Sequence, residues 1–326
     1  MSPGELAAEV TPAARPKRSA FAVDLGLLAA IVSAAAFGSS GPFAKSLLVT
    51  GWAPPTIVTL RIGIAALVLL GPALWSVRGR WDVLRAERGM ILAYGLVSVA
   101  GCQVAYFNAV ARMPVGVALL LEYLGIILVV LWVWARTRRR PAPTVALGGA
   151  LSVAGLVLVL DVAGSATVDV VGVVWGLGAA VGLAAFFVIA SRAHSDLPAV
   201  ALAGFGMLVG TVALVALQLV GALPTAWASA DVTIRGVHLP WYAAILELAL
   251  VAAAAAYLLG TIGARALGST VASFVGLTEV LFAVLLAWLL LGELPGPIQL
   301  VGGALILAGV VAVRVGELRG SGFRDT

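Results

Sequence analysis

Four ionisable residues lie inside long apolar stretches of this chain, and they are the residues best placed to do chemistry. They are Arg61, Glu122, Glu247 and Glu279. A charged group is costly to bury in an apolar medium, so such groups normally face a protein interior or a water-filled cavity. A carboxyl group in that environment holds a proton more readily than in water, and it can exchange that proton near neutral pH. These residues are therefore candidates for ligand binding or proton exchange.

One stretch of the chain occurs twice. Residues 114–157 align without a gap with residues 268–311, at a displacement of 154 residues. The matches are dense and include Gly148-Gly149-Ala150-Leu151 against Gly302-Gly303-Ala304-Leu305. Each copy is predicted to be a long apolar helix, a short Pro-x-Pro turn and a second apolar helix. The protein is therefore a duplication, and the region between its two halves is the best candidate for a functional site.

Two of the glutamates lie in the two copies at related positions. Under the displacement of 154 residues, Glu122 matches Gly276, and Gly125 matches Glu279. Positions three residues apart share one face of a helix, so both glutamates should project from the same face of equivalent helices. We expect that face to line a cavity between the halves. A structural carboxyl group that bonds to a neighbouring helix is the alternative for each.

Other polar residues of the apolar stretches have two interpretations each. Arg61 can pair with a glutamate or meet a substrate carboxylate, or its long side chain can extend to the outer surface. Gln103 and Tyr106 share a helix face, and Tyr106 and Tyr257 each follow an alanine in corresponding helices. These three are candidates for substrate contact or for hydrogen bonds that join helices. Glu247 has no counterpart in the first half, which favours a structural role.

Composition and length place these residues in a membrane protein. The 326 residues are 62% hydrophobic and 11% charged, with mean hydropathy +1.11. The apolar runs repeatedly reach the ~20 residues that a helix needs to cross a bilayer, and they lack the alternation of a membrane barrel. The predicted fold is all-α, with ten transmembrane helices in two five-helix repeats. The expected spans are 24–47, 55–76, 90–111, 115–135, 143–162, 170–191, 198–221, 241–262, 269–291 and 298–314.

The positions of Lys and Arg predict the orientation. With the N-terminus in the cytoplasm, 16 of these residues fall on the cytoplasmic side and 3 on the opposite side. Cytoplasmic loops of membrane proteins carry this excess, so both termini are predicted to be cytoplasmic. Five helices is an odd number, so the second repeat must enter the membrane from the opposite side, and the repeats are predicted to be inverted. The basic residues are thus a topology signal and do not indicate nucleic-acid binding.

The predicted division of the chain follows these spans. Residues 1–22 form a disordered cytoplasmic N-terminus, 23–163 the first repeat, 168–315 the second repeat and 316–326 a cytoplasmic tail. The outer loop 222–240 is either a lid or an ordinary surface loop. No cofactor, metal site or catalytic residue is expected, because nucleotide-binding motifs, metal-ligand spacings and catalytic triads are not recognisable. The single cysteine, Cys102, cannot form an intramolecular disulfide.

Several motifs resemble the EamA-domain family of the drug/metabolite transporter superfamily. The resemblance rests on Glu279-Val280-Leu281-Phe282-Ala283, on Ala287-Trp288-Leu289-Leu290-Leu291-Gly292-Glu293 and on Gly302-Gly303-Ala304-Leu305-Ile306. The family commonly has proline where Val280 stands, and it favours arginine at the position of Arg61. The segment Gly116–Gly125 is similar to threonine/homoserine exporters within that family. The resemblance implies ten helices in two repeats and secondary transport of small metabolites, often the export of amino acids.

The sequence therefore predicts a secondary active transporter of the bacterial cytoplasmic (inner) membrane. It would move a small polar metabolite such as an amino acid outward by alternating access, with coupling to protons through Glu122 or Glu279 as a further hypothesis. The expected partners are that small molecule, membrane lipids and protons, in a monomer or homodimer. The alternative is an integral-membrane enzyme that acts on a lipid or polyprenyl carrier, with the arginines at 136–140 as its candidate site. A scaffold or a passive channel is a third class.

Overall fold

The computed structural model describes residues 20–113, 115–138, 142–159, 169–192, 196–234, 236–291 and 296–321. The predicted disordered segment falls almost entirely outside these residues, and α1 already begins at Ala20. In chain order the elements are α1 (Ala20–Gly38), α2 (Ser40–Val49), α3 (Pro54–Ser76), α4 (Trp81–Ala86), α5 (Arg88–Ala93), η1 (Tyr94–Gly101), α6 (Cys102–Val110), α7 (Val115–Tyr123), α8 (Gly125–Thr137), α9 (Pro143–Val159), α10 (Val170–Ala190), α11 (Ala199–Leu219), β1 (Val232–Ile234), β2 (Val237–Leu239), α12 (Trp241–Ala249), η2 (Leu250–Ala255), α13 (Ala256–Leu267), α14 (Ser269–Gly276), α15 (Thr278–Leu291) and α16 (Pro297–Ser321).

Within the described residues, seven helical stretches are long and apolar enough to cross a membrane. They are Val23–Val49, Pro54–Ser76, Arg88–Val110, Val170–Ala190, Ala199–Leu219, Trp241–Leu267 and Ser269–Leu286. Two shorter apolar helices cover Pro143–Leu158 and Leu300–Val313. Large apolar side chains such as Leu67 and Val174 are exposed on the outside of the bundle, where a soluble protein would carry polar groups. The protein is therefore a multi-pass membrane protein.

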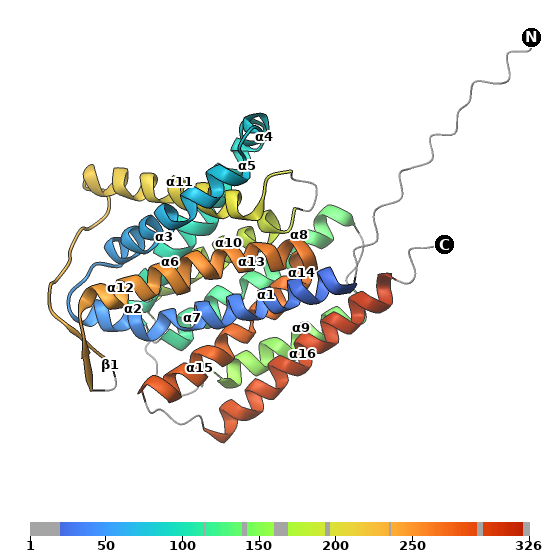
Figure 1. Ribbon diagram of the computed structural model, residues 1–326. Coiled ribbons are helices and arrows are strands. Elements are labelled where there is room, and N and C mark those ends of the chain that lie inside the picture. Colours follow the sequence, from blue (N-terminus) through green and yellow to red (C-terminus); the bar gives the residue numbers. More distant parts are fainter. Residues whose placement is uncertain are drawn as a thin grey trace, which may run out of the picture.

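Helices of the first half lie beside helices of the second half. The pairs in closest contact are α9 with α16, α3 with α11, α1 with α13 and α6 with α10 (Figure 1). The buried core runs through the middle of these pairs. The two halves are thus interlocked along their length, and the centre of the bundle is built from both.

The first apolar stretch is interrupted, where the sequence predicted one continuous helix. α1 ends at Gly38 and α2 begins at Ser40, with Ser39 between them. The cause is Pro42, because a proline ring clashes with the carbonyl group four residues earlier and cannot donate a backbone hydrogen bond. The break leaves the side chains of Ser39 and Ser40 facing other helices.

Two further interruptions fall at nearly equivalent places in the duplicated stretch. α7 gives way to α8 at Leu124, and α14 gives way to α15 at Leu277. Each break lies next to a glycine, Gly125 or Gly276, and glycine weakens a helix interior. A Cβ atom at Gly125 would lie 2.5 Å from the carbonyl oxygen of Ala180. Glycine is therefore required there for the close approach of α10.

The third helical stretch of each half contains a π-helical segment, which the sequence did not indicate. The segments are η1 in the first half and η2 in the second half. Such segments are frequent at functional sites. Their wider turn displaces backbone carbonyl groups from the regular hydrogen-bond ladder. Both segments lie where the halves meet.

The loop between α11 and α12 corrects the prediction of an all-α chain. β1 and β2 form a short antiparallel hairpin in which Val232 pairs with Leu239. Its turn contains Gly236, whose φ of 74° suits glycine. The backbone N–H of Ala53, at the start of α3, donates to the carbonyl of Ala226 at 3.0 Å. The hairpin lies at the end of the bundle opposite to the start of α1 and the end of α16 (Figure 1).

Candidate functional site

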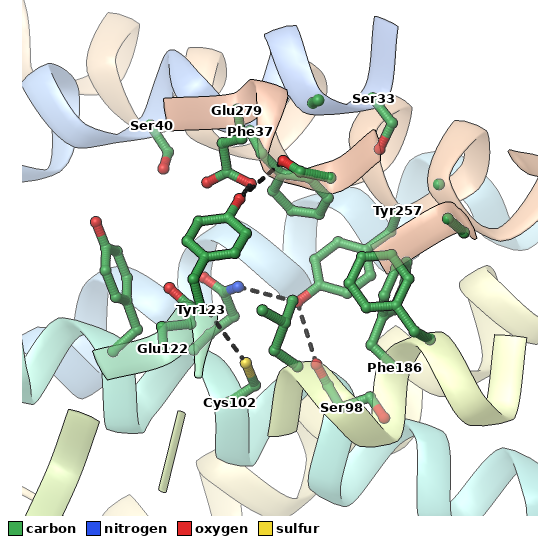
Figure 2. Close-up of a pocket in the computed structure, with 18 of the residues that line it drawn as sticks. Ser33, Phe37, Ser40, Ser98, Cys102, Glu122, Tyr123, Phe186, Tyr257 and Glu279 are labelled. Atoms are coloured by element: carbon green, nitrogen blue, oxygen red, sulfur yellow. Dashed lines mark hydrogen bonds between the residues drawn. The ribbon is translucent and has the colours of Figure 1, made fainter. Parts of the chain in front are cut away.

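A small cavity lies at the centre of the bundle, between the two halves. Its volume is about 50 Å³, and its walls come from α1, α2, α3, η1, α6, α7, α10, α13, α14 and α15 (Figure 2). A water molecule occupies roughly 10–15 Å³ of such volume, so the cavity has room for only a few waters. All six residues predicted as site residues line it: Arg61, Gln103, Tyr106, Glu122, Tyr257 and Glu279.

The two glutamates approach the cavity from opposite sides of their helix breaks. Glu122 lies near the end of α7, just before Leu124, and Glu279 lies in the first turn of α15, just after Leu277. Figure 2 shows Tyr123 between the two carboxyl groups. The breaks therefore place carboxyl groups from both halves on the wall of one cavity.

Each carboxyl group has a neighbour from another helix. The hydroxyl of Tyr123 lies 2.8 Å from Oε2 of Glu279 and 3.0 Å from the carbonyl oxygen of Gly276. The thiol of Cys102 lies 3.5 Å from Oε1 of Glu122, a weak contact. Neither glutamate forms a short ion pair among the described residues, so each keeps acceptor capacity for a ligand or a proton.

Arg61 is buried and does not extend to the surface. Only 1% of the residue is exposed. One terminal nitrogen donates to Oε1 of Gln103 at 2.7 Å, and the other donates to the carbonyl oxygen of Ala252 in η2. The guanidinium also lies over the ring of Phe107, 5.7 Å from its centroid, at a distance typical of a cation–π contact. Arg61 thus provides a positive charge at the cavity wall and joins the two halves.

Gln103 and Tyr257 link the halves at positions related by the duplication. They are separated by 154 residues, and Nε2 of Gln103 donates to the hydroxyl of Tyr257 at 3.0 Å. The hydroxyl of Tyr257 in turn donates to the carbonyl of Ser98 in η1 at 3.3 Å. Ser98 and Ala252 are related by the same displacement. Each π-helical segment therefore offers an equivalent carbonyl group to a side chain at the interface.

Tyr106 contributes a ring to the wall, where 7% of the residue is exposed. It lies on the same helix face as Gln103, as the spacing of three residues predicted. The displacement of 154 residues matches Tyr257 with Gln103 and not with Tyr106. The two tyrosines therefore occupy different positions in the repeat, although each follows an alanine.

Sequence reasoning missed several wall residues, of which Tyr123 is the most important. Its hydroxyl contacts Glu279, and its ring separates the carboxyl groups. Its position beside Glu122 in an apolar helix was an available signal. Cys102, Ser33 and Ser40 also line the cavity. Their positions depend on helix breaks and on contacts that are distant in sequence.

Glu247 lies outside the central cavity. It is half-buried in α12, and its Oε1 accepts a hydrogen bond from Ser39 at 2.5 Å. Its Oε2 is buried without a hydrogen-bond partner among the described residues. The bond connects α12 to the break between α1 and α2, which agrees with the structural role expected for this residue.

The described residues contain no group of three His, Cys, Asp or Glu side chains that could hold a metal ion. The arginine cluster considered for a lipid-acting enzyme lies at the end of α8. Arg136 and Arg138 are exposed there, while residues 139–141 lie outside the described part of the chain. His194 and the predicted tail residues 322–326 lie outside it too.

The fold and the cavity define a multi-pass membrane protein whose two halves share a central polar site. The chain belongs to the EamA-like transporter family, whose domain matches it twice, over residues 24–161 and 170–315. A solved structure titled "Crystal structure of protein" has the same fold, with a TM-score of 0.69 and 23% sequence identity over 91% of this chain and 98% of that chain. No curated protein matches the chain. Membership in a transporter family does not support the enzyme alternative.

Proposed function

We propose that this protein is a secondary active transporter that exports a small zwitterionic or amine metabolite, of the amino acid type, by alternating access. The observation that carries the proposal is the central cavity, where Glu122, Glu279 and Arg61 meet from both halves. A negative pair and a positive group at one site suit a ligand with both an ammonium and a carboxylate group. The outward direction rests on the resemblance to amino acid exporters.

The size of the cavity supports alternating access. About 50 Å³ is too small for most metabolites, since ligand pockets usually measure ~300–1,000 Å³. Substrate entry therefore requires the halves to move apart on one side. The breaks at Ser39, Leu124 and Leu277 are places where helix segments can tilt without loss of many backbone hydrogen bonds.

The charges of the cavity support coupling to protons. Two carboxyl groups face one guanidinium, and an uncompensated charge is costly in a low-dielectric interior. The excess carboxyl can be neutralised by a proton or by the ammonium group of a substrate. Competition between the two would exchange one substrate for one proton, which is the basis of a proton-driven antiporter.

The proposed topology has ten transmembrane helices in two inverted repeats, over residues 23–163 and 168–315. Both termini face the cytoplasm of a bacterial cell, with the protein in the inner membrane. The distribution of arginines supports this orientation. The placement of the start of α1 and the end of α16 at one end of the bundle agrees with it.

Transport by purified protein in sealed vesicles tests the proposal. A panel of labelled amino acids, amines and nucleobases is offered with and without an imposed pH gradient. We expect saturable flux of one amino acid or amine, accelerated by the gradient. Glu122→Gln and Glu279→Gln should each abolish the acceleration, because neither amide can exchange a proton.

Asp82→Asn, in the short helix α4 outside the candidate spans, is the matched control and should transport as the unmodified protein does. Gradient-driven flux that persists in both glutamine variants would contradict coupling through these residues. Linear, non-saturating flux would indicate a channel and contradict alternating access.

A further inference from the structure

A second cavity lies beside the central one, between α8, α9 and α14. Its volume is about 340 Å³. Its walls are formed by aliphatic side chains of α8 and α9 together with Phe274 and Leu277, and Ser152 and Tyr123 contribute the side-chain polar groups. We call this cavity the apolar crevice. It is several times larger than the central cavity and differs from it in chemical character.

The apolar crevice is open to the outside of the bundle. Ile127 on its rim is 42% exposed, and Ala146 and Ala150 on α9 are exposed as well. These residues lie in apolar helices whose other outward side chains, such as Leu131 and Leu147, are also exposed. The medium around such helices is the hydrocarbon of the bilayer. The crevice is therefore continuous with lipid, and its apolar walls disfavour water.

The volume of the apolar crevice decides between possible occupants. One turn of a helix with side chains occupies roughly 500 Å³, so a helix of a second copy does not fit. An engineered apolar cavity of ~150 Å³ binds benzene, and by that ratio the crevice holds a chain of roughly a dozen carbon atoms. The walls offer no charged group to a polar head group among the described residues. These properties match a lipid acyl chain.

The apolar crevice borders the central cavity. Tyr123 lines both cavities, so its side chain forms a shared wall. Its hydroxyl contacts Glu279, and Leu277, at the break before α15, also lines the crevice. An occupant of the crevice therefore packs against the breaks of both duplicated helices.

We propose that the apolar crevice binds one acyl chain of a membrane phospholipid, and that this chain packs against Tyr123. The acyl chain fills space that would otherwise be empty, and it holds Tyr123 in the position that contacts Glu279. The bilayer thereby gains a direct physical contact with the wall of the central cavity. This binding does not depend on the identity of the transported molecule.

Photolabelling with a phospholipid that carries a photoreactive group in its acyl chain tests the proposal. The full-length protein is placed in vesicles of phosphatidylcholine with a small fraction of this probe, illuminated and digested for mass spectrometry. We expect label to concentrate on Tyr123, at the end of α7, and on crevice residues of α8, α9 and α14. Ala150→Phe should reduce that labelling about tenfold, the loss expected when about two methylene groups are excluded from an apolar site.

Ala154→Phe is the matched control. Ala154 lies one turn further along α9, is exposed and does not line the crevice, so its labelling pattern should be unchanged. Ala146→Phe provides a second filling variant in case Ala150→Phe is not monodisperse. Folding of each variant is checked by size-exclusion chromatography before illumination.

Four results would overturn the proposal. One is uniform labelling of all outward helix faces, and another is labelling that both folded filling variants leave intact. Displacement of the probe by free fatty acid but not by unlabelled phospholipid would assign the crevice to a free acid. Displacement by a transported substrate, in step with its transport, would make the crevice a substrate subsite. The readout is binding, so a failure of the proposed transport function leaves this test intact.

Discussion

In the first half of the molecule, the helix that follows the first π-helical segment carries Gln103, and the second half carries Tyr257 at the equivalent position. The carbonyl groups that accept from Tyr257 and Arg61, those of Ser98 and Ala252, are equivalent as well. The backbone at the interface thus follows the duplication closely. The side chains that use this backbone differ between the halves.

The ionisable groups differ more than the backbone does. Glu122 precedes the helix break in the first half, whereas Glu279 follows the break in the second half. Arg61 is buried in α3, while α11, the second helix of the second half, contains no charged residue. The duplication therefore produced a symmetric scaffold that encloses one asymmetric site. A single site between two similar halves is the arrangement that alternating access requires.

The removal of Arg61 should have the largest effect on stability. Arg61→Met leaves two buried carboxyl groups without a nearby cation. It also breaks the hydrogen bond to Gln103 within the first half and the hydrogen bond to Ala252 of the second half. We expect the free energy of unfolding to fall by about 3–5 kcal/mol, the cost typical of removing one partner from a buried charged network. Thermal unfolding in detergent measures it.

The control for this prediction is Arg112→Met, because the Arg112 side chain is 45% exposed in a surface ion pair with Asp169. It should change stability by less than ~1 kcal/mol. Equal stability of Arg61→Met and the unmodified protein would show that the carboxyl groups do not need the guanidinium.

Gly125 stands in the first copy where the second copy has Glu279. Its substitution should lower stability nearly as much. Gly125→Ala places a Cβ atom 2.5 Å from the carbonyl oxygen of Ala180, so α8 and α10 must separate. Overpacking of this kind costs about 1–3 kcal/mol. This contact also explains why the carboxyl group cannot simply move from Glu122 to position 125.

Gly149→Ala is the matched control on α9, where the nearest atom to a new Cβ is a ring carbon of Phe274 at 3.6 Å. It should be neutral or slightly stabilising, because alanine favours a helix. Thermal unfolding of both variants is the measurement. An equal response of the two would mean that the approach of α10 does not constrain Gly125.

The hydrogen bond between Gln103 and Tyr257 should contribute less to the free energy of unfolding. A double-mutant cycle with Gln103→Leu and Tyr257→Phe isolates the contribution of their contact across the halves. Hydrogen bonds between membrane helices average about 0.6 kcal/mol in such cycles, and we expect a coupling energy near that value. A coupling energy of zero would show that the two side chains are neighbours without a shared energetic role.

The smallest effect concerns Asp169, which begins the first helix of the second half. Its carboxylate accepts hydrogen bonds from the backbone N–H groups of Gly172 and Val171, and these bonds lower its pKa. The pKa of Asp169 is lower in the folded state than in the unfolded state. Its carboxylate therefore stabilises the folded protein fully at pH values above the pKa of the unfolded state. This stabilisation is lost as the pH falls through the folded pKa.

Asp169→Ala should therefore lower the unfolding temperature slightly at neutral pH, and the difference should vanish in acid. Unfolding temperatures of both proteins across an acidic pH series measure this. A difference that stays constant with pH would assign the effect to helix geometry and not to the charge.

The sequence was sufficient to predict that Glu122 and Glu279 share a cavity wall. Their spacing within the repeat, combined with helical periodicity, placed both on one face. It was not sufficient to predict that Arg61 is buried, because the partners of Arg61 lie on α6 and η2, far away in the sequence. Tyr123 was missed for a similar reason, since its hydroxyl contacts Glu279 from the other half.

The sequence could predict only some of the helix breaks. Pro42 could have predicted the break at Ser39 from local chemistry alone. The break at Leu277 has no proline beside it, since Val280 stands where the family commonly has proline. The pattern of ten apolar stretches gave the approximate positions of the helices, while seven of the described stretches meet the length and hydropathy of a span.

By itself the sequence determined the membrane class, the duplication and the family of this protein. Apolar length and a fixed displacement between copies are properties of the chain that need no knowledge of contacts. The tertiary structure alone decided that the central cavity is small, that Arg61 bridges the halves and that the apolar crevice shares Tyr123 with the cavity. These features arise where helices from the two halves pack against each other. Such packing depends on side chains more than a hundred residues apart, which local patterns do not record.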